Sequence, residues 1–75
     1  MPQPPITDEQ LQNWFTYHAP QPGQQEKYVE IRNAALDFAK VIRNNTPSSA
    51  DCTVAIRKVR EAVMTANQAI ACGGL

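Results

Sequence analysis

Two matched apolar patterns, separated by a four-residue break, constrain the fold of this chain more than any other feature. In the stretch 24–43, apolar side chains recur at spacings of 3, 4, 3 and 4, at Tyr28, Ile31, Ala35, Phe38 and Ile42. In the stretch 48–72 the spacings are 4, 3, 4, 3 and 4, at Cys52, Ile56, Val59, Val63, Ala66 and Ile70. At about 100° per residue each set forms one narrow stripe on a helix. The sequence therefore predicts two long helices that pack along matching seams.

The break between the two patterns predicts a tight hairpin. Asn44-Asn45-Thr46-Pro47 stops the first helix near residue 43, because proline lacks a backbone donor and disfavours helix in the residue before it. Ser48 as N-cap, with Asp51 as its capping-box partner, is expected to start the second helix. Gly73-Gly74 is expected to end it near residue 72. So short a connection makes the two helices antiparallel neighbours.

A shorter helix is predicted ahead of the hairpin, after a proline-rich extended lead over residues 1–6. Thr7 and Gln10 fit a capping box, and Leu11, Trp14 and Phe15 share one face of a helix over 8–15. Residues 16–23 form a loop, because they contain two prolines and a glycine. The predicted fold is all-α, with a short N-terminal helix and a long antiparallel helical hairpin in a single domain over residues 1–75.

Composition favours self-assembly and argues against several classes of function. A chain of 75 residues buries a small core, and two helices share only one seam. Four apolar side chains are left uncovered, namely Leu36, Val41, Val54 and Met64, so we expect a homo-oligomer. Seven Lys and Arg balance seven Asp and Glu, which argues against binding to long nucleic acids. The sequence has no apolar run that could span a bilayer and no signal-peptide pattern, so we expect a cytosolic protein without a membrane partner.

The residues that most often carry catalysis or bind metals form no recognisable pattern. Cys52 and Cys72 lie about 30 Å apart along one predicted helix, too far for a disulfide, and with one histidine they make no zinc motif. Asp37 and Glu61 have the spacing of helix-surface residues. We therefore expect no enzyme, no cofactor and no metal, although the sequence leaves open a nucleophile that uses His18 as its base.

The first loop and one cation are better candidates for a binding site. Tyr17 and His18 lie in the proline-bounded loop, and Arg32 lies on the first long helix at the border between seam and solvent. A base that stacks on an aromatic ring gains about 1–3 kcal/mol, and a guanidinium can neutralise a phosphate. Two alternatives remain: Tyr17 can be a surface-packing aromatic, and Arg32 can be solvated or paired with Glu26 or Asp37.

These residues also resemble those of a known family. The similar motifs are Phe15-x-Tyr17-His18-x-Pro20, Lys27-Tyr28-x-x-Ile31-Arg32-x-x-Ala35-x-x-Phe38-Ala39-x-x-Ile42, Pro47-Ser48-x-x-Asp51 and Arg60-Glu61-Ala62-Val63-Met64-x-Ala66-Asn67-x-Ala69-Ile70-Ala71. They look like the small helical-hairpin domain shared by phage anti-CBASS protein two and the anti-Thoeris one proteins. The likeness covers about residues 14–72. It favours the anti-CBASS branch, because the anti-Thoeris branch carries a β-rich portion that has no counterpart in these 75 residues.

The resemblance implies a phage protein that binds the cyclic dinucleotide messengers of bacterial CBASS immunity and sequesters them without cleavage in the host bacterial cytoplasm. It implies a compact hexamer that encloses the ligands between protomers. The implied ligand contacts are Tyr17, His18 and Arg32, with Pro20, Tyr28 and Asn67 as further candidates. Some members also bind cyclic trinucleotides through a basic residue that follows Ala-Ile-Ala, where this chain has Cys72.

A second hypothesis comes from a different class of function. An oligomeric helical adaptor could use the aromatic segment to dock on a host protein, with no nucleotide ligand. In that case Asn67 would be an ordinary interhelical hydrogen-bonding residue, and the purified protein would retain no nucleotide.

Overall fold

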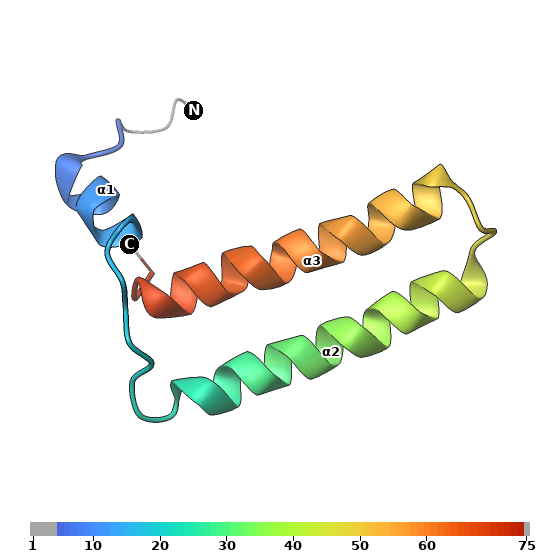
Figure 1. Cartoon of the computed structure of the whole chain (residues 1–75), viewed down its shortest axis with the longest axis horizontal. Helices are drawn as coiled ribbons and strands as arrows, with labels where there is room; N and C mark the ends of the chain where they lie inside the picture. The colour runs from blue at the N-terminus through green and yellow to red at the C-terminus, as the bar shows by residue number, and fades with distance from the viewer. Residues whose placement is uncertain (1–4, 75) are drawn as a thin grey trace.

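The fold is a helical hairpin with a short helix beside the C-terminal end of its second arm (Figure 1). The computed structural model describes residues 5–74, and its helices are α1 (Asp8–Trp14), α2 (Gln24–Asn45) and α3 (Ala50–Ala71). In Figure 1, α2 and α3 run antiparallel side by side, and α1 lies near the C-terminal end of α3. No strand occurs within the described residues. The predicted all-α hairpin with a short N-terminal helix is confirmed, whereas most of the extended lead predicted for residues 1–6 lies outside the described residues.

Helix α1 begins at the predicted capping box. The Gln10 amide N–H donates to Thr7 Oγ1 over 3.1 Å, and the Thr7 amide N–H donates to Gln10 Oε1 over 3.0 Å. These reciprocal bonds satisfy two donors that the first helical turn leaves free. The helix ends at Trp14 and Phe15 is its C-cap, one residue earlier than predicted.

The seam of α2 differs from the predicted one at a single position. Phe38 was expected to face α3, but its side chain is 57% exposed. Ala39, which the sequence placed at the margin, is half-buried and lies between α2 and α3. Once Ala39 replaces Phe38, the residues that face α3 are Tyr28, Ile31, Ala35, Ala39 and Ile42. The side chains of α2 that face α3 are therefore smaller in total volume than the sequence pattern predicted.

Helix α2 extends to Asn45, two residues beyond the predicted end. The Asn45 side chain donates to the Val41 carbonyl over 2.8 Å, and the Thr46 hydroxyl donates to the Ile42 carbonyl over 2.7 Å. The Ile42 carbonyl is one of the last four in the helix, so the Thr46 hydroxyl supplies a partner that the helix itself does not. Thr46 then takes an extended conformation, as expected for a residue before proline.

Helix α3 begins later than predicted, and its cap is the other serine. Ser49 is the N-cap, and its hydroxyl accepts from the Cys52 amide over 3.2 Å. Ser48 and Asp51 therefore do not form the predicted capping box. The six predicted seam residues of α3 are all half-buried, which confirms that pattern. At the other end Gly73 (φ 66°) and Gly74 (φ 85°) donate to the Ile70 and Ala69 carbonyls, the pair of bonds of a Schellman motif.

A single hairpin leaves most of its apolar surface accessible. Cys72 is the only buried hydrophobic residue among those described, with 6% of its surface exposed. The accessible surface is 6347 Å², against about 4,600 Å² for a compact monomer of this mass. The radius of gyration is 15.7 Å, against about 11 Å for a globular chain of this length. Leu36, Val41, Val54 and Met64 are all exposed, as predicted.

The identity of the N-cap of α3 can be tested by replacing two neighbouring serines. Ser49→Ala removes the acceptor for the Cys52 amide, so the free energy of unfolding should fall by about 1 kcal/mol. Ser48→Ala is the matched control and should change it by less than about 0.5 kcal/mol. Urea unfolding followed by circular dichroism, at one protein concentration, measures both. The opposite ranking would restore Ser48 as the cap.

Candidate functional site

The open end of the hairpin is held together by hydrogen bonds to the last turn of α3. Asn13 Nδ2 donates to the Cys72 carbonyl over 3.0 Å, and Gln24 Nε2 donates to the Ile70 carbonyl over 3.3 Å. Gln68 Nε2 donates to the Trp14 carbonyl over 3.3 Å. These side-chain bonds fix both α1 and the start of α2 on α3, and the Ile70 carbonyl accepts from Gln24 in addition to the Gly73 amide.

His18 is fixed by the same arrangement. Its Nε2 atom lies 2.7 Å from the Asn13 carbonyl oxygen, and the ring is half-buried. A carbonyl oxygen only accepts, so Nε2 carries a hydrogen and donates it. In the neutral ring Nδ1 is then an acceptor, and within the described residues nothing donates to it. The loop therefore presents a histidine of defined tautomer.

An open groove collects most of the predicted site residues. It has a volume of about 500 Å³. Its lining residues are Tyr17, His18, Pro20, Tyr28, Met64, Asn67, Gln68 and Ala71. We call it the aromatic groove. Tyr17, His18 and Pro20 come from the first loop, Tyr28 from α2 and Asn67 from α3, so residues up to 50 positions apart meet at one surface.

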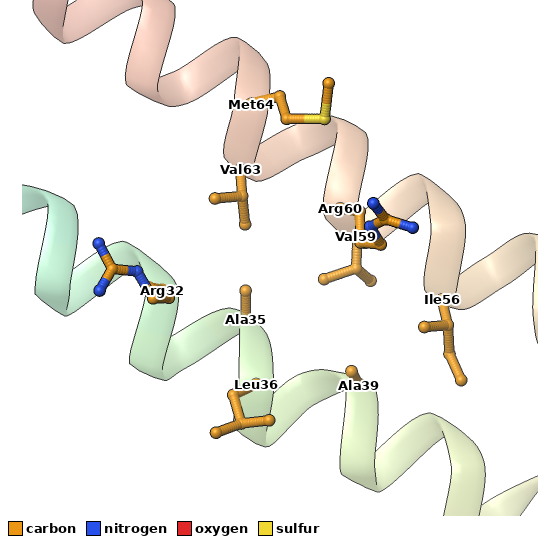
Figure 2. Close-up of a pocket in the computed structure, with 9 residues that line it drawn as sticks. All are labelled: Arg32, Ala35, Leu36, Ala39, Ile56, Val59, Arg60, Val63 and Met64. Carbon is orange, nitrogen blue, oxygen red and sulfur yellow. The ribbon is translucent and has the colours of Figure 1, made fainter.

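Arg32 lies beside the aromatic groove rather than in it. It lines a smaller groove of about 320 Å³ together with Pro20 and Tyr28, which also line the aromatic groove. It also lines a trough of about 370 Å³ between α2 and α3, which we call the interhelical groove (Figure 2). Met64 is shared between this trough and the aromatic groove. The three hollows therefore form one continuous face that carries all six predicted site residues.

No described residue pairs with Arg32. The structure places neither a carboxylate within ion-pair distance of it nor a hydrogen-bond partner beside it. Pairing with Glu26 or Asp37, one of the alternatives that the sequence left open, is absent. None of the three hollows has a carboxylate among its described lining residues. The face is therefore aromatic and apolar with uncompensated positive charge.

Asn67 has an incomplete set of hydrogen bonds. Its Oδ1 atom is buried and has no partner within the described residues. A buried acceptor without a partner costs roughly 1–3 kcal/mol, so such groups need an explanation. Other atoms of Asn67 line the aromatic groove, whereas Oδ1 itself lies beneath its surface.

Sequence reasoning missed two residues of this face, Arg60 and Met64, as contacts. Together with Asn67 and Ala71 they follow a 4, 3, 4 spacing along one flank of α3. Arg60 and Met64 line the interhelical groove, and Met64, Asn67 and Ala71 line the aromatic groove. That spacing could have revealed them. The sequence places Arg60 and Asn67 seven residues apart on that flank, but it does not show that the flank borders a groove.

The arrangement suits binding better than bond-breaking chemistry. The aromatic groove offers two tyrosine rings, an imidazole and amide groups, and the adjoining hollows add a guanidinium. Among residues 5–74, no three His, Cys, Asp or Glu side chains gather closely enough to hold a metal ion. Cys52 and Cys72 are both free thiols. None of the described helices is long and apolar enough to cross a membrane.

The protein is a small helical-hairpin domain. One of its faces carries a groove large enough for a small ligand, and Arg32 lies beside that groove. The model of one family, described as the Acb2/Tad1 hairpin domain, matches residues 7–71. The chain therefore belongs to the anti-CBASS two and anti-Thoeris one family, and the resemblance found in the sequence is confirmed. No curated protein and no solved structure is significantly similar to it.

Replacing Asn67 tests whether its buried oxygen lacks a partner in the unliganded protein. Asn67→Leu removes a buried unsatisfied acceptor, so the free energy of unfolding of the unliganded protein should stay constant or rise by up to about 1 kcal/mol. Val63→Ala, one turn away on the same helix, is the control and should lower it by about 1 kcal/mol or more. Thermal unfolding at matched concentration measures both. A loss for Asn67→Leu as large as that of the control would show that the oxygen has a partner in the folded protein.

Proposed function

We propose that this protein is a phage anti-defence protein that binds and sequesters the cyclic dinucleotide messengers of bacterial CBASS immunity, without cleaving them, in the host cytoplasm. Family membership is consistent with an anti-defence role. The observation that carries the ligand class is the continuous face that joins Tyr17 and Tyr28 to the unpaired Arg32. Its main groove falls within the range of about 300–1,000 Å³ that small-molecule sites occupy.

Each part of a cyclic dinucleotide has a matching group on this face. Tyr17 is 84% exposed, so its ring is free to stack on a base. Within residues 5–74 nothing donates to His18 Nδ1, so it can accept from an N–H or O–H group of a base edge or ribose, and the Asn67 side chain adds an amide to the same groove. Arg32 neutralises a phosphodiester, and its guanidinium does so with two donors in a fixed plane. Pro20 and Tyr28 form the wall that joins the two regions.

A homo-oligomer, with a hexamer favoured, completes the site in this proposal. A ligand in the aromatic groove of a single protomer would stay open to water on one side, because Tyr17 projects into solvent. A second copy related by a two-fold axis suits a ligand with two bases and two phosphates. The same assembly would cover the exposed apolar residues of α2, such as Leu36 and Phe38.

The proposal requires high affinity, because a sequestering protein acts by stoichiometry. Free messenger falls only when protein copies exceed messenger and the dissociation constant lies below that of the effector. A value of ~10 nM corresponds to about −11 kcal/mol. Two stacked bases and charge-assisted contacts to the phosphates are of the right order, provided that the site is enclosed.

Paired aromatic variants test the site. Tyr17→Ala should weaken binding of 3′,3′-cyclic GMP–AMP by roughly 10- to 100-fold, because a stacked base gains about 1–3 kcal/mol. Phe15→Ala is the matched control, since Phe15 is as exposed as Tyr17, at 85% against 84%, but lines none of the grooves described. Isothermal titration calorimetry measures affinity, and light scattering after size exclusion checks the assembly.

Three outcomes would contradict this assignment. Absence of heat and of thermal shift with the wild-type protein would exclude this messenger. Equal losses for Tyr17→Ala and Phe15→Ala would show that the two aromatics act through packing. Disassembly of both variants would show that the two aromatics hold the assembly together and would support a structural role for them.

The absence of cleavage is a separate prediction. Purified protein loaded with 3′,3′-cyclic GMP–AMP, washed and then heated should release the ligand with unchanged mass and in stoichiometric amount. We expect this because no serine, threonine, cysteine or carboxylate is among the described residues that line the three grooves, so His18 has none of these groups beside it there to activate. Mass spectrometry of the released material decides it. Linear dinucleotide or mononucleotide in place of the cyclic form would establish an enzyme instead.

A further inference from the structure

We infer that Arg60, on the opposite wall of the interhelical groove from Arg32, is a second residue that binds the anionic backbone of the ligand. The inference rests on the proposed function and extends its site along α3. The ligand's bases lie at the aromatic groove, and its anionic backbone lies toward the two arginines. The interhelical groove thereby becomes part of the ligand site.

The position of Arg60 is the first observation that supports this inference. Arg32 from α2 and Arg60 from α3 border the same groove (Figure 2), whose floor is formed by Ala35, Ala39, Val59 and Val63. In Figure 2 the two guanidinium groups lie at separate points, one on each helix, and do not face each other.

The positive charges of Arg32 and Arg60 also support this inference. Within the described residues Arg60, like Arg32, has neither an ion-pair partner nor a hydrogen-bond partner. The chain as a whole has equal numbers of basic and acidic residues, yet no acidic residue lines this groove. An anion that contacts both arginines would neutralise two exposed positive charges that have no other partner within the described residues. An apolar floor also excludes water and strengthens the attraction.

The continuity of the face is the third observation. Met64 lines both the interhelical groove and the aromatic groove, and it lies one turn after Arg60 on α3. Asn67 follows at the next position along the same flank. A ligand whose base contacts Tyr17 and Asn67 can therefore reach Arg60 by passing over Met64, without crossing a ridge of the protein surface.

The test compares Arg60→Gln with Arg57→Gln in the full-length chain. Arg57 is an exposed arginine of α3, one turn before Arg60, that lines none of the grooves described, so it controls for a general loss of positive charge. The dissociation constant for 3′,3′-cyclic GMP–AMP is measured by calorimetry at several salt concentrations. Arg60→Gln should weaken binding about 10-fold and lower the slope of log affinity against log salt by about one, as expected for the loss of a phosphate contact. Arg57→Gln should leave both values near those of the wild type.

A conservative variant separates charge from packing. Arg60→Lys keeps the charge and should retain the wild-type salt slope, with a smaller loss of affinity because a lysine cannot bind a phosphate with two fixed donors. The oligomeric state of each variant is measured by light scattering. If both Arg60 variants disassemble, Arg60 is an assembly residue and the inference is wrong.

The remaining outcomes distinguish this inference from the function on which it rests. Wild-type protein that binds no cyclic dinucleotide would overturn both. Wild-type protein that binds, together with an Arg60→Gln variant of equal affinity and equal salt slope, would overturn the role of Arg60 alone. Equal losses for Arg57→Gln and Arg60→Gln would also overturn it, because the effect would then be one of general charge.

Discussion

The packing of α2 against α3 along a single seam is the interaction on which the rest of the structure depends. Two helices share one face, so each seam residue is covered on one side and reached by solvent on the other, and most remain half-buried. On α2 the central seam positions are Ala35 and Ala39, whose methyl groups cannot fill the space opposite Val59 and Val63. The interhelical groove therefore follows from residue size. Larger side chains at these two positions would stabilise the hairpin through added packing and would remove the groove.

Hydrogen bonds, more than apolar burial, position the candidate site at the open end of the hairpin. No residue of α1 is buried, yet Asn13 and Gln68 tie this helix to the last turn of α3. The first loop departs from there, which sets Tyr17 and His18 over the α3 flank that carries Asn67. The Cys72 carbonyl at the end of α3 thus accepts a side-chain hydrogen bond that holds α1, and with it the first loop, beside the groove.

The sequence predicted the helices and the α3 seam because apolar spacing records which face of a helix is covered. It failed at Phe38 and Ala39, since a pattern based on hydrophobicity ranks phenylalanine above alanine, whereas position 39 and not position 38 lies on the face that turns toward α3. It also failed at Ser48 and Ser49, which differ as caps only through backbone geometry. The resemblance led to Tyr17 and Arg32, but Arg60 emerged only when both walls of the groove were in place. The unpaired oxygen of Asn67 likewise requires three-dimensional coordinates.

Several features of this face are unfavourable in an isolated chain. An unsatisfied buried oxygen and exposed apolar side chains each raise the free energy of the unliganded protomer, and two arginines beside one groove have no partner within the described residues. Under the proposed function one event satisfies both the arginines and the apolar side chains, because an anionic aromatic ligand covered by a second protomer supplies charge and contact area together. Ligand binding and assembly would then act on the same surface. By thermodynamic linkage each must strengthen the other to the same degree, so a protein of this design would enclose its ligand more tightly as it assembles.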